Sequence, residues 1–268
     1  MRSSSGRAVD PGELAAQLRA LGVNPGDVLL VHMSYRAVRP VEGGPAGVIE
    51  ALLSAVGEKG TIVMPSWGNN DDAPFDVAAT PVDASLGVTA DIFRRMPDVS
   101  RSNHPFAFAA LGPHAAAITA DPLPLPPHRL ESPVGRVYEM DGKVLLLGVG
   151  HDSDTTIHLA EVFAQVPYGI SKHCTVWKDG RHVRVDYLEN DHCCQRFALA
   201  DEWLRAEGVQ HEGRVGNAHA RLVKSRDIVA ITQDRLQRDP LVFLHAPEET
   251  CAECDEARSS VRPNSAVS

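Results

Sequence analysis

Residues 143–164 read KVLLLGVGHDSDTTIHLAEVFA, an apolar run that stops at glycine and a polar turn and then starts a helix. The apolar run is as long as a strand, and an all-apolar strand of this kind is buried on both faces of a sheet. Ligands of α/β proteins gather beyond the carboxyl ends of such strands. The stretch therefore predicts an α/β fold with its chemistry at the start of the helix.

The predicted helix carries His158 and Glu161, three residues apart on one face, so the carboxylate can reach the imidazole. Asp154 or Thr155 would be the N-cap. A base with a carboxylate that fixes its tautomer is the minimum needed to take a proton from an incoming nucleophile. Spacing alone leaves a structural role for the histidine open.

Strand-like and helix-like runs alternate before residue 167. We expect strands at 27–32, 60–66, 106–112 and 143–150, and helices at 11–22, 45–57, 87–96 and 155–164. This alternation predicts a mostly parallel central sheet flanked by helices. The proline-rich stretch 121–133 cannot form a regular element and is expected to be a long loop.

The C-terminal part reads differently. Segments 174–178 and 181–188 alternate and flank Asp179-Gly180, which predicts a β-hairpin. Helices are expected at 191–207 and 226–237, and a last strand at 241–245. With a flexible N-terminus at 1–10 and a disordered tail at 259–268, we predict one domain over 11–258, whose hairpin and helical part begins near residue 168.

Composition limits the partners. The chain has 268 residues, 43% hydrophobic and 23% charged, and a formal net charge of -9. This acidity argues against nucleic acid and suits a cationic ligand. No apolar run reaches the length of a membrane span, and the N-terminus lacks the apolar core of a secretion signal. We expect a cytoplasmic protein.

The five cysteines lie in the C-terminal half, and Cys251 and Cys254 have the C-x-x-C spacing of a zinc site. In a reducing cytoplasm a structural zinc is more plausible than a disulfide. Cys193 and Cys194 complete the set we expect, with His192 and Cys174 as other candidates for the third and fourth ligands.

Six segments resemble the aminoglycoside 3-N-acetyltransferases. They are LLVHMSYRAVRP (29–40), VMPSW (63–67), RSNHPFAFAA (101–110), DPLPLPPH (121–128), the strand, turn and helix around His158, and DYLENDHCC (186–194). The resemblance covers about residues 11–258. It implies a non-GNAT antibiotic acetyltransferase fold and acetyl transfer from acetyl-CoA to the 3-amino group of 2-deoxystreptamine drugs such as apramycin, gentamicin and tobramycin, which confers resistance.

The same resemblance implies the site. His158 would be the general base and Glu161 its orienter, with direct attack of the amine on the thioester in a ternary complex. Carboxylates would bind the aminoglycoside, although Asp191 could equally be an N-cap; these are Asp71, Glu189 and Asp191. The residues expected to bind coenzyme A are Ser34, Tyr35, Arg36, Val38, Arg101, Ser102 and Phe106. Arg101 could instead be a structural arginine. We expect a monomer or a homodimer.

Three alternatives stay open. The same fold could acetylate another amine. A zinc-dependent hydrolase could be built from His151, Asp152 and His158, although the two histidines lack the i, i+4 spacing of a helical zinc pair. A non-catalytic aminoglycoside-binding protein would keep the acidic residues but would not need His158.

Overall fold

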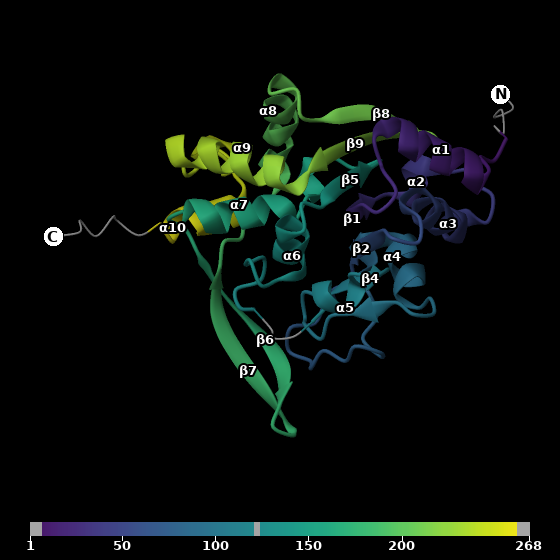
Figure 1. Cartoon of the computed structure of the whole chain (residues 1–268). Coiled ribbons are helices and arrows are strands. Elements are labelled where there is room, and N and C mark those ends of the chain that lie inside the picture. Colours follow the sequence, from purple (N-terminus) through teal and green to yellow (C-terminus); the bar gives the residue numbers. More distant parts are fainter. Residues whose placement is uncertain (1–6, 121–123, 262–268) are drawn as a thin grey trace, which may run out of the picture.

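A seven-stranded mixed sheet forms the centre of the molecule (Figure 1). The computed structural model describes residues 7–120 and 124–261. The strand order is β3-β4-β2-β1-β5-β9-β8. The strands are β1 Val28–Met33, β2 Thr61–Pro65, β3 Ser100–Arg101, β4 Phe108–Leu111, β5 Lys143–Leu147, β8 His211–Val215 and β9 Ala218–Lys224.

The prediction of a mostly parallel sheet is wrong. β1 pairs in parallel with β2 and β5, but the ladders β2/β4, β3/β4, β5/β9 and β8/β9 are antiparallel. The parallel centre is the part that the apolar runs predicted. The antiparallel hairpin β8/β9 was missed, although its two-residue Gly216-Asn217 turn is a hairpin signal.

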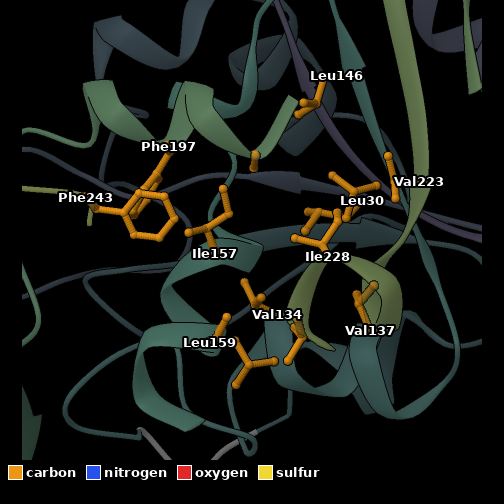
Figure 2. Packing of buried hydrophobic residues seen from close by; sticks show 14 of the residues in the cluster. Leu30, Val134, Val137, Leu146, Ile157, Leu159, Phe197, Val223, Ile228 and Phe243 are labelled. Atoms are coloured by element: carbon orange, nitrogen blue, oxygen red, sulfur yellow. The ribbon is translucent and has the colours of Figure 1, made fainter. Parts of the chain in front are cut away.

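Helices cover both faces of this sheet. They are α1 Pro11–Leu21, α2 Tyr35–Val38, α3 Gly44–Val56, α4 Gly87–Arg94, α5 Ala115–Ile118, α6 Pro133–Glu139, α7 Thr156–Ala164, α8 Ala200–Ala206, α9 Ser225–Arg238 and α10 Ala252–Ser259. Leu29 of β1 packs in the core beneath α1 and α3, whereas Leu30 packs with α6, α7 and α9 (Figure 2). The central strands are therefore buried on both faces, as their unbroken apolar sequence requires.

The stretch 143–164 folds as predicted. β5 ends at Leu147, a short turn follows, and α7 begins at Thr156, whose N–H donates to Asp154 Oδ1 over 2.9 Å. The helix ends at Ala164, and its C-cap, Gln165, has a left-handed backbone. Its N-terminus thus lies beyond the carboxyl end of a buried parallel strand, where ligands bind in α/β folds.

The predicted hairpin is β6 Ile170–Lys178 and β7 Arg181–Glu189, which project from the rest of the molecule as a two-stranded arm (Figure 1). Asp179 and Gly180 have φ of 50° and 74°, as a tight hairpin turn requires. β7 ends at Glu189, so the hairpin delivers this residue close to the main sheet.

Two other C-terminal predictions differ from the structure. The expected helix at 191–207 begins only with a 3₁₀ turn at Gln195–Leu199, followed by α8. The strand expected at 241–245 is wrong, because this segment forms turns, with Leu244 N–H donating to Leu241 O. Phe243 is fully buried without any ladder, since a short apolar run is compatible with several buried conformations.

The chain ends fall mainly outside the described residues, as do residues 121–123 of the predicted loop. Within the described part, Val9 bridges to Val41, and Asp10 caps α1. Ser259 belongs to α10, and Ser260 Oγ accepts a hydrogen bond from Gly169 N–H. The limits of the domain at 11 and 258 stay a prediction. Among the described helices, none has the length and apolarity to cross a membrane.

Candidate active site

His158 and Glu161 lie one turn apart on α7. Nδ1 of His158 is 2.7 Å from Oε2 of Glu161, and the Glu161 side chain is fully buried, whereas 15% of the His158 side chain is exposed. Nδ1 is therefore committed to the carboxylate. Nε2 is the ring nitrogen left for other partners.

The other oxygen of Glu161 is also held. Oε1 accepts a hydrogen bond from Tyr168 Oη (2.5 Å) and lies 2.9 Å from His192 Nε2. Burial alone would raise the pKa of Glu161, but hydrogen bonds with His158 and His192 outweigh it and lower this pKa to about 2. Glu161 thus remains ionised at neutral pH. It can fix the tautomer of His158 and stabilise a protonated ring.

Two residues from distant segments reach the imidazole of His158. Cys194 Sγ lies 3.6 Å from Nε2, and the His128 ring stacks on the His158 ring at a centroid distance of 4.7 Å. Burial would lower the pKa of His158, but the adjacent Cys194 sulfur and Glu161 carboxylate raise it well above the ordinary value. The pKa of His128 is held well below its usual value by burial and by His158. His128 is therefore a neutral ring stacked on His158.

A cleft of about 340 Å³ opens beside His158 and collects the three predicted carboxylates, Asp71, Glu189 and Asp191. It is lined by Trp67, Gly68, Asn69, Asp71, Phe106, His128, Thr155, His158, Lys172, Tyr187, Glu189 and Asp191. The cleft joins a base to several acidic groups, which suits a cationic amine. A larger pocket of about 730 Å³ contains none of the predicted site residues.

The carboxylates differ in environment. Glu189 is only 8% exposed, and burial together with Asp191 raises its pKa to about 7. Asp191 Oδ2 forms an ion pair with Lys172 Nζ at 2.6 Å. The N-cap alternative for Asp191 does not hold, because the next helical turn begins at Gln195 with Cys194 in the cap position.

Sequence reasoning missed two hydroxyl groups in the cleft. Tyr187 precedes Glu189 by two residues on β7, a spacing that puts both on one face. Its hydroxyl is buried and finds no hydrogen-bond partner among residues 7–120 and 124–261. Thr155 Oγ1 lies 3.2 Å from His32 Nε2, and burial lowers the pKa of His32 to about 4. His32 is therefore neutral at the pH of a cell.

The predicted coenzyme A residues at 34–38 lie where β1 ends. Ser34 N–H donates to Leu147 O, so this turn lies beside the chain that leads from β5 to α7. Arg36 is exposed. Val38 is fully buried, and its N–H is bonded to Ser34 O. Of the backbone donors expected here, those of Ser34 and Val38 are thus used by the fold itself.

The three other residues predicted to bind coenzyme A, Arg101, Ser102 and Phe106, have different environments. Arg101 is 9% exposed, and its guanidinium donates hydrogen bonds to the carbonyl oxygens of Ser66, Val77 and Thr80. These contacts match the structural alternative, since they pin the loop that follows β2. Ser102 Oγ is buried and accepts from Phe108 N–H. Phe106 lines the acidic cleft.

The cysteine cluster differs from the predicted set by one residue. Ligand atoms of Cys193, His245, Cys251 and Cys254 all lie within 4.8 Å of one another. Cys193 Sγ is 3.6 Å from Cys254 Sγ and 3.3 Å from His245 Nδ1. Sulfur ligands about 2.3 Å from a tetrahedral zinc lie about 3.8 Å apart, so this group fits Zn²⁺. His245 takes the place that we assigned to Cys194, which instead contacts the base.

The hydrolase alternative finds no support. His151 is fully buried, with Nδ1 3.0 Å from Asp154 Oδ2 and Nε2 2.8 Å from Gln210 Oε1. Both ring nitrogens are engaged, so His151 has no nitrogen left to share a metal with His158.

A histidine paired with a buried carboxylate and facing an acidic cleft is the arrangement expected of an enzyme that acts on a cationic amine. The family model "Aminoglycoside 3-N-acetyltransferase" matches residues 30–237. Aminoglycoside N(3)-acetyltransferase IV of Salmonella sp is 64% identical over 236 residues, which is 88% of this chain and 90% of the relative. The chain belongs to the aminoglycoside 3-N-acetyltransferase family, which confirms the enzyme class that the six segments indicated.

Solved structures share the fold. The apoenzyme of aminoglycoside acetyltransferase AAC(3)-IVa superposes with a TM-score of 0.95 at 61% identity, over 97% of this chain and 100% of that one. A histidine-to-alanine mutant of that enzyme is known in complex with a gentamicin (TM-score 0.95) and with apramycin (TM-score 0.87). AAC-IIIb, in a binary complex with CoASH, is 27% identical with a TM-score of 0.79, over 87% of this chain and 97% of its own.

Proposed function

We propose that this protein transfers the acetyl group of acetyl-CoA to the 3-amino group of 2-deoxystreptamine aminoglycosides, including gentamicin, apramycin and tobramycin, and so confers resistance. The observation that carries the proposal is the position of His158, paired with Glu161 and opening onto a cleft that holds Asp71, Glu189 and Asp191. The complexes of AAC(3)-IVa with a gentamicin and with apramycin support this substrate class.

The chemistry follows from the charge of the substrate. An aminoglycoside is a polycation at neutral pH, and the carboxylates of the cleft bind its ammonium groups. An ammonium has no lone pair, so the 3-amino group must first release its ammonium proton to water and react as the free amine. The pKa of His158 is raised, so its ring must likewise enter the reaction in the neutral form. As the amine attacks, His158 Nε2 takes the second proton from the nitrogen, and the Glu161 carboxylate stabilises the resulting imidazolium.

In the transfer itself, the amine nitrogen bonds to the thioester carbonyl carbon and the carbon–sulfur bond breaks. The coenzyme A thiolate leaves and takes the proton that His158 has accepted. Acetyl-CoA would approach along the turn at 34–38, which lies beside the carboxyl end of β5. Thr155 also faces the cleft, and its hydroxyl could donate to the carbonyl oxygen as negative charge develops there.

The test is coenzyme A release with gentamicin, apramycin, tobramycin and an amine that lacks 2-deoxystreptamine. His158→Ala should lower kcat by roughly 10²–10⁴-fold, the usual contribution of a general base, with a smaller effect on KM. His211→Ala, at an exposed histidine of β8, is the control and should behave as wild type. Turnover of the unrelated amine but not of the drugs would favour the alternative, an acetyltransferase of another amine.

We also propose a structural Zn²⁺ held by Cys193, His245, Cys251 and Cys254. The proposal rests on the four converging ligand atoms and on thiolate and imidazole being preferred zinc ligands. Metal analysis of protein purified without a polyhistidine tag should give about one zinc per chain. A content well below half an equivalent would contradict it.

We place the reaction in the cytoplasm, because acetyl-CoA is a metabolite of that compartment. Whether the protein is a monomer or a homodimer stays a prediction.

A further inference from the structure

Cys193 lies between two residues that contact the catalytic pair. On one side, His192 Nε2 is 2.9 Å from Glu161 Oε1; on the other, Cys194 Sγ is 3.6 Å from His158 Nε2. Cys193 itself belongs to the group of four potential metal ligands. The potential metal ligand Cys193 is therefore flanked in the sequence by His192, which contacts Glu161, and by Cys194, which contacts His158.

This segment has little regular structure to hold it. Residues 190–194 lie between the end of β7 and the 3₁₀ turn at Gln195, outside any helix or strand. Cys194 has φ of 59°, in the left-handed region, which is unfavourable for a residue other than glycine. Such a conformation persists only where the surroundings impose it.

The local hydrogen bonds do not supply that anchor. Cys194 N–H donates to His192 Nδ1 over 3.1 Å, and Cys194 Sγ contacts His192 O at 3.2 Å. These contacts fix His192 relative to Cys194, so the two side chains move together. They do not fix the pair relative to α7.

The partners of Cys193 lie on a well-attached part of the fold. Cys254 is 1% exposed within α10, and Ser260, just after this helix, accepts a hydrogen bond at Oγ from the N–H of Gly169, the residue directly before the hairpin. Arg258 donates to the carbonyl of His245, which fixes the histidine ligand against α10. A metal at this point would join the irregular segment to a buried helix.

We propose that the metal centre holds the catalytic base in place: by anchoring Cys193 it keeps His192 on Glu161 and Cys194 on His158. This inference rests on the proposed zinc site. Loss of the metal frees the segment, and Glu161 then loses the His192 contact that orients it toward His158. Catalysis suffers more than substrate binding, because only Asp191 of the three cleft carboxylates lies in this segment, whereas Asp71 and Glu189 lie outside it.

The experiment compares the full-length protein as purified, stripped of zinc by a chelator under reducing conditions, and refilled with one equivalent of Zn²⁺. Stripping should lower kcat with gentamicin by about 10- to 100-fold, the cost of a misplaced catalytic group, and leave KM within about threefold. Refilling should restore kcat. Full kcat in folded, zinc-free protein would overturn the inference, as would the absence of bound zinc.

A second readout does not depend on turnover. The short His158 to Glu161 hydrogen bond should give a far-downfield proton resonance that is absent in His158→Ala. It should disappear on stripping and return with zinc. If the zinc-loaded protein shows this resonance but acetylates no aminoglycoside, the proposed function is wrong. The response of the resonance to zinc removal still tests whether the metal holds His158 and Glu161 together. A resonance that is unchanged by stripping would refute the coupling.

Because the stripped protein could unfold, a variant tests the same link with the metal in place. His192→Phe removes the hydrogen bond to Glu161, because a phenyl ring has no N–H, but keeps an aromatic ring against Phe197 and Phe243. It leaves all four ligands intact, so it should bind one zinc, keep its circular dichroism spectrum and lose both kcat and the downfield resonance. His182→Phe, at an exposed histidine of the hairpin, is the matched control and should lose neither. Wild-type kcat in zinc-loaded His192→Phe would overturn the role of this residue as the support.

Discussion

Cys194 Sγ lies 3.6 Å from His158 Nε2, the ring nitrogen that Glu161 leaves free. Cysteine, histidine and glutamate in this order resemble the arrangement of a nucleophilic triad. Two routes are thus conceivable for the acetyl group, either directly to the amine or by way of the Cys194 thiol.

Direct attack predicts that Cys194→Ala keeps kcat within about tenfold of wild type, because the base and its carboxylate remain. Cys174→Ala, at a buried position of strand β6, is the control for loss of a thiol. The decisive measurement is mass spectrometry of protein mixed with acetyl-CoA alone. A stable acetyl adduct on Cys194, with loss of turnover in Cys194→Ala, would contradict direct attack and would show that the acetyl group passes through the Cys194 thiol.

How much of this site was visible in the sequence depends on distance along the chain. His158 and Glu161 are three residues apart, so helical geometry alone predicts their contact. His192 and Cys194 reach the same pair from more than thirty positions away. Residue spacing carries no information about such contacts, because they form only when the segment after β7 packs against α7 in the folded chain.

The same limit applies to the fold. The parallel centre of the sheet was predictable because an apolar run such as β5 suits burial on both faces. β8 reads His-Glu-Gly-Arg-Val, which has almost no apolar pattern because it forms the sheet edge. His245 escaped notice as a ligand because its apolar neighbours suggested a strand, whereas the segment turns and brings the imidazole to Cys254.

We expect aminoglycoside binding to depend on pH through Glu189. Burial and then the neighbouring Asp191 raise its pKa to about 7, so the group is neutral below pH 7 and anionic above it. Only the anion pairs with an ammonium. KM for gentamicin should therefore fall by about tenfold between pH 6 and pH 8, as expected for one group with this pKa. The drug's own amines titrate too, so the measurement is the difference between wild type and Glu189→Gln.

The same shift affects stability. The folded protein holds this proton more tightly than the unfolded chain, so the carboxyl of Glu189 destabilises the fold increasingly as pH rises from its unfolded pKa toward 7. Glu189→Gln should thus raise Tm at pH 8 and change it little at pH 4. An equal change at both pH values would mean that the effect comes from packing rather than charge.

Tyr187 carries a buried hydroxyl for which the described part of the chain offers no partner. A substrate group that bonds to it would add about 0.5–1.5 kcal/mol of binding. Tyr187→Phe should then raise KM for gentamicin by roughly two- to tenfold, which is that energy converted, without lowering Tm. Tyr138→Phe, at a tyrosine that packs on Phe163 away from the cleft, should leave KM unchanged. A lower Tm with unchanged KM would assign the hydroxyl to the fold.

Of the two predicted coenzyme A arginines, we expect Arg101 to stabilise the fold and Arg36 to bind the cofactor. Arg101 donates to three backbone carbonyls in the 66–80 loop, and leaving such buried acceptors unpaired costs about 1–3 kcal/mol each. Arg101→Ala should therefore lower Tm markedly.

Arg36 is exposed beside the turn after β1. Arg36→Ala should therefore keep Tm and raise KM for acetyl-CoA. The rise in KM should be smaller at high salt, because salt screens the pairing of a guanidinium with phosphate. Titrating acetyl-CoA at low and high salt, with Tm recorded for each variant, tests both roles. A loss of Tm in Arg36→Ala, or unchanged Tm together with a raised acetyl-CoA KM in Arg101→Ala, would reverse the assignment.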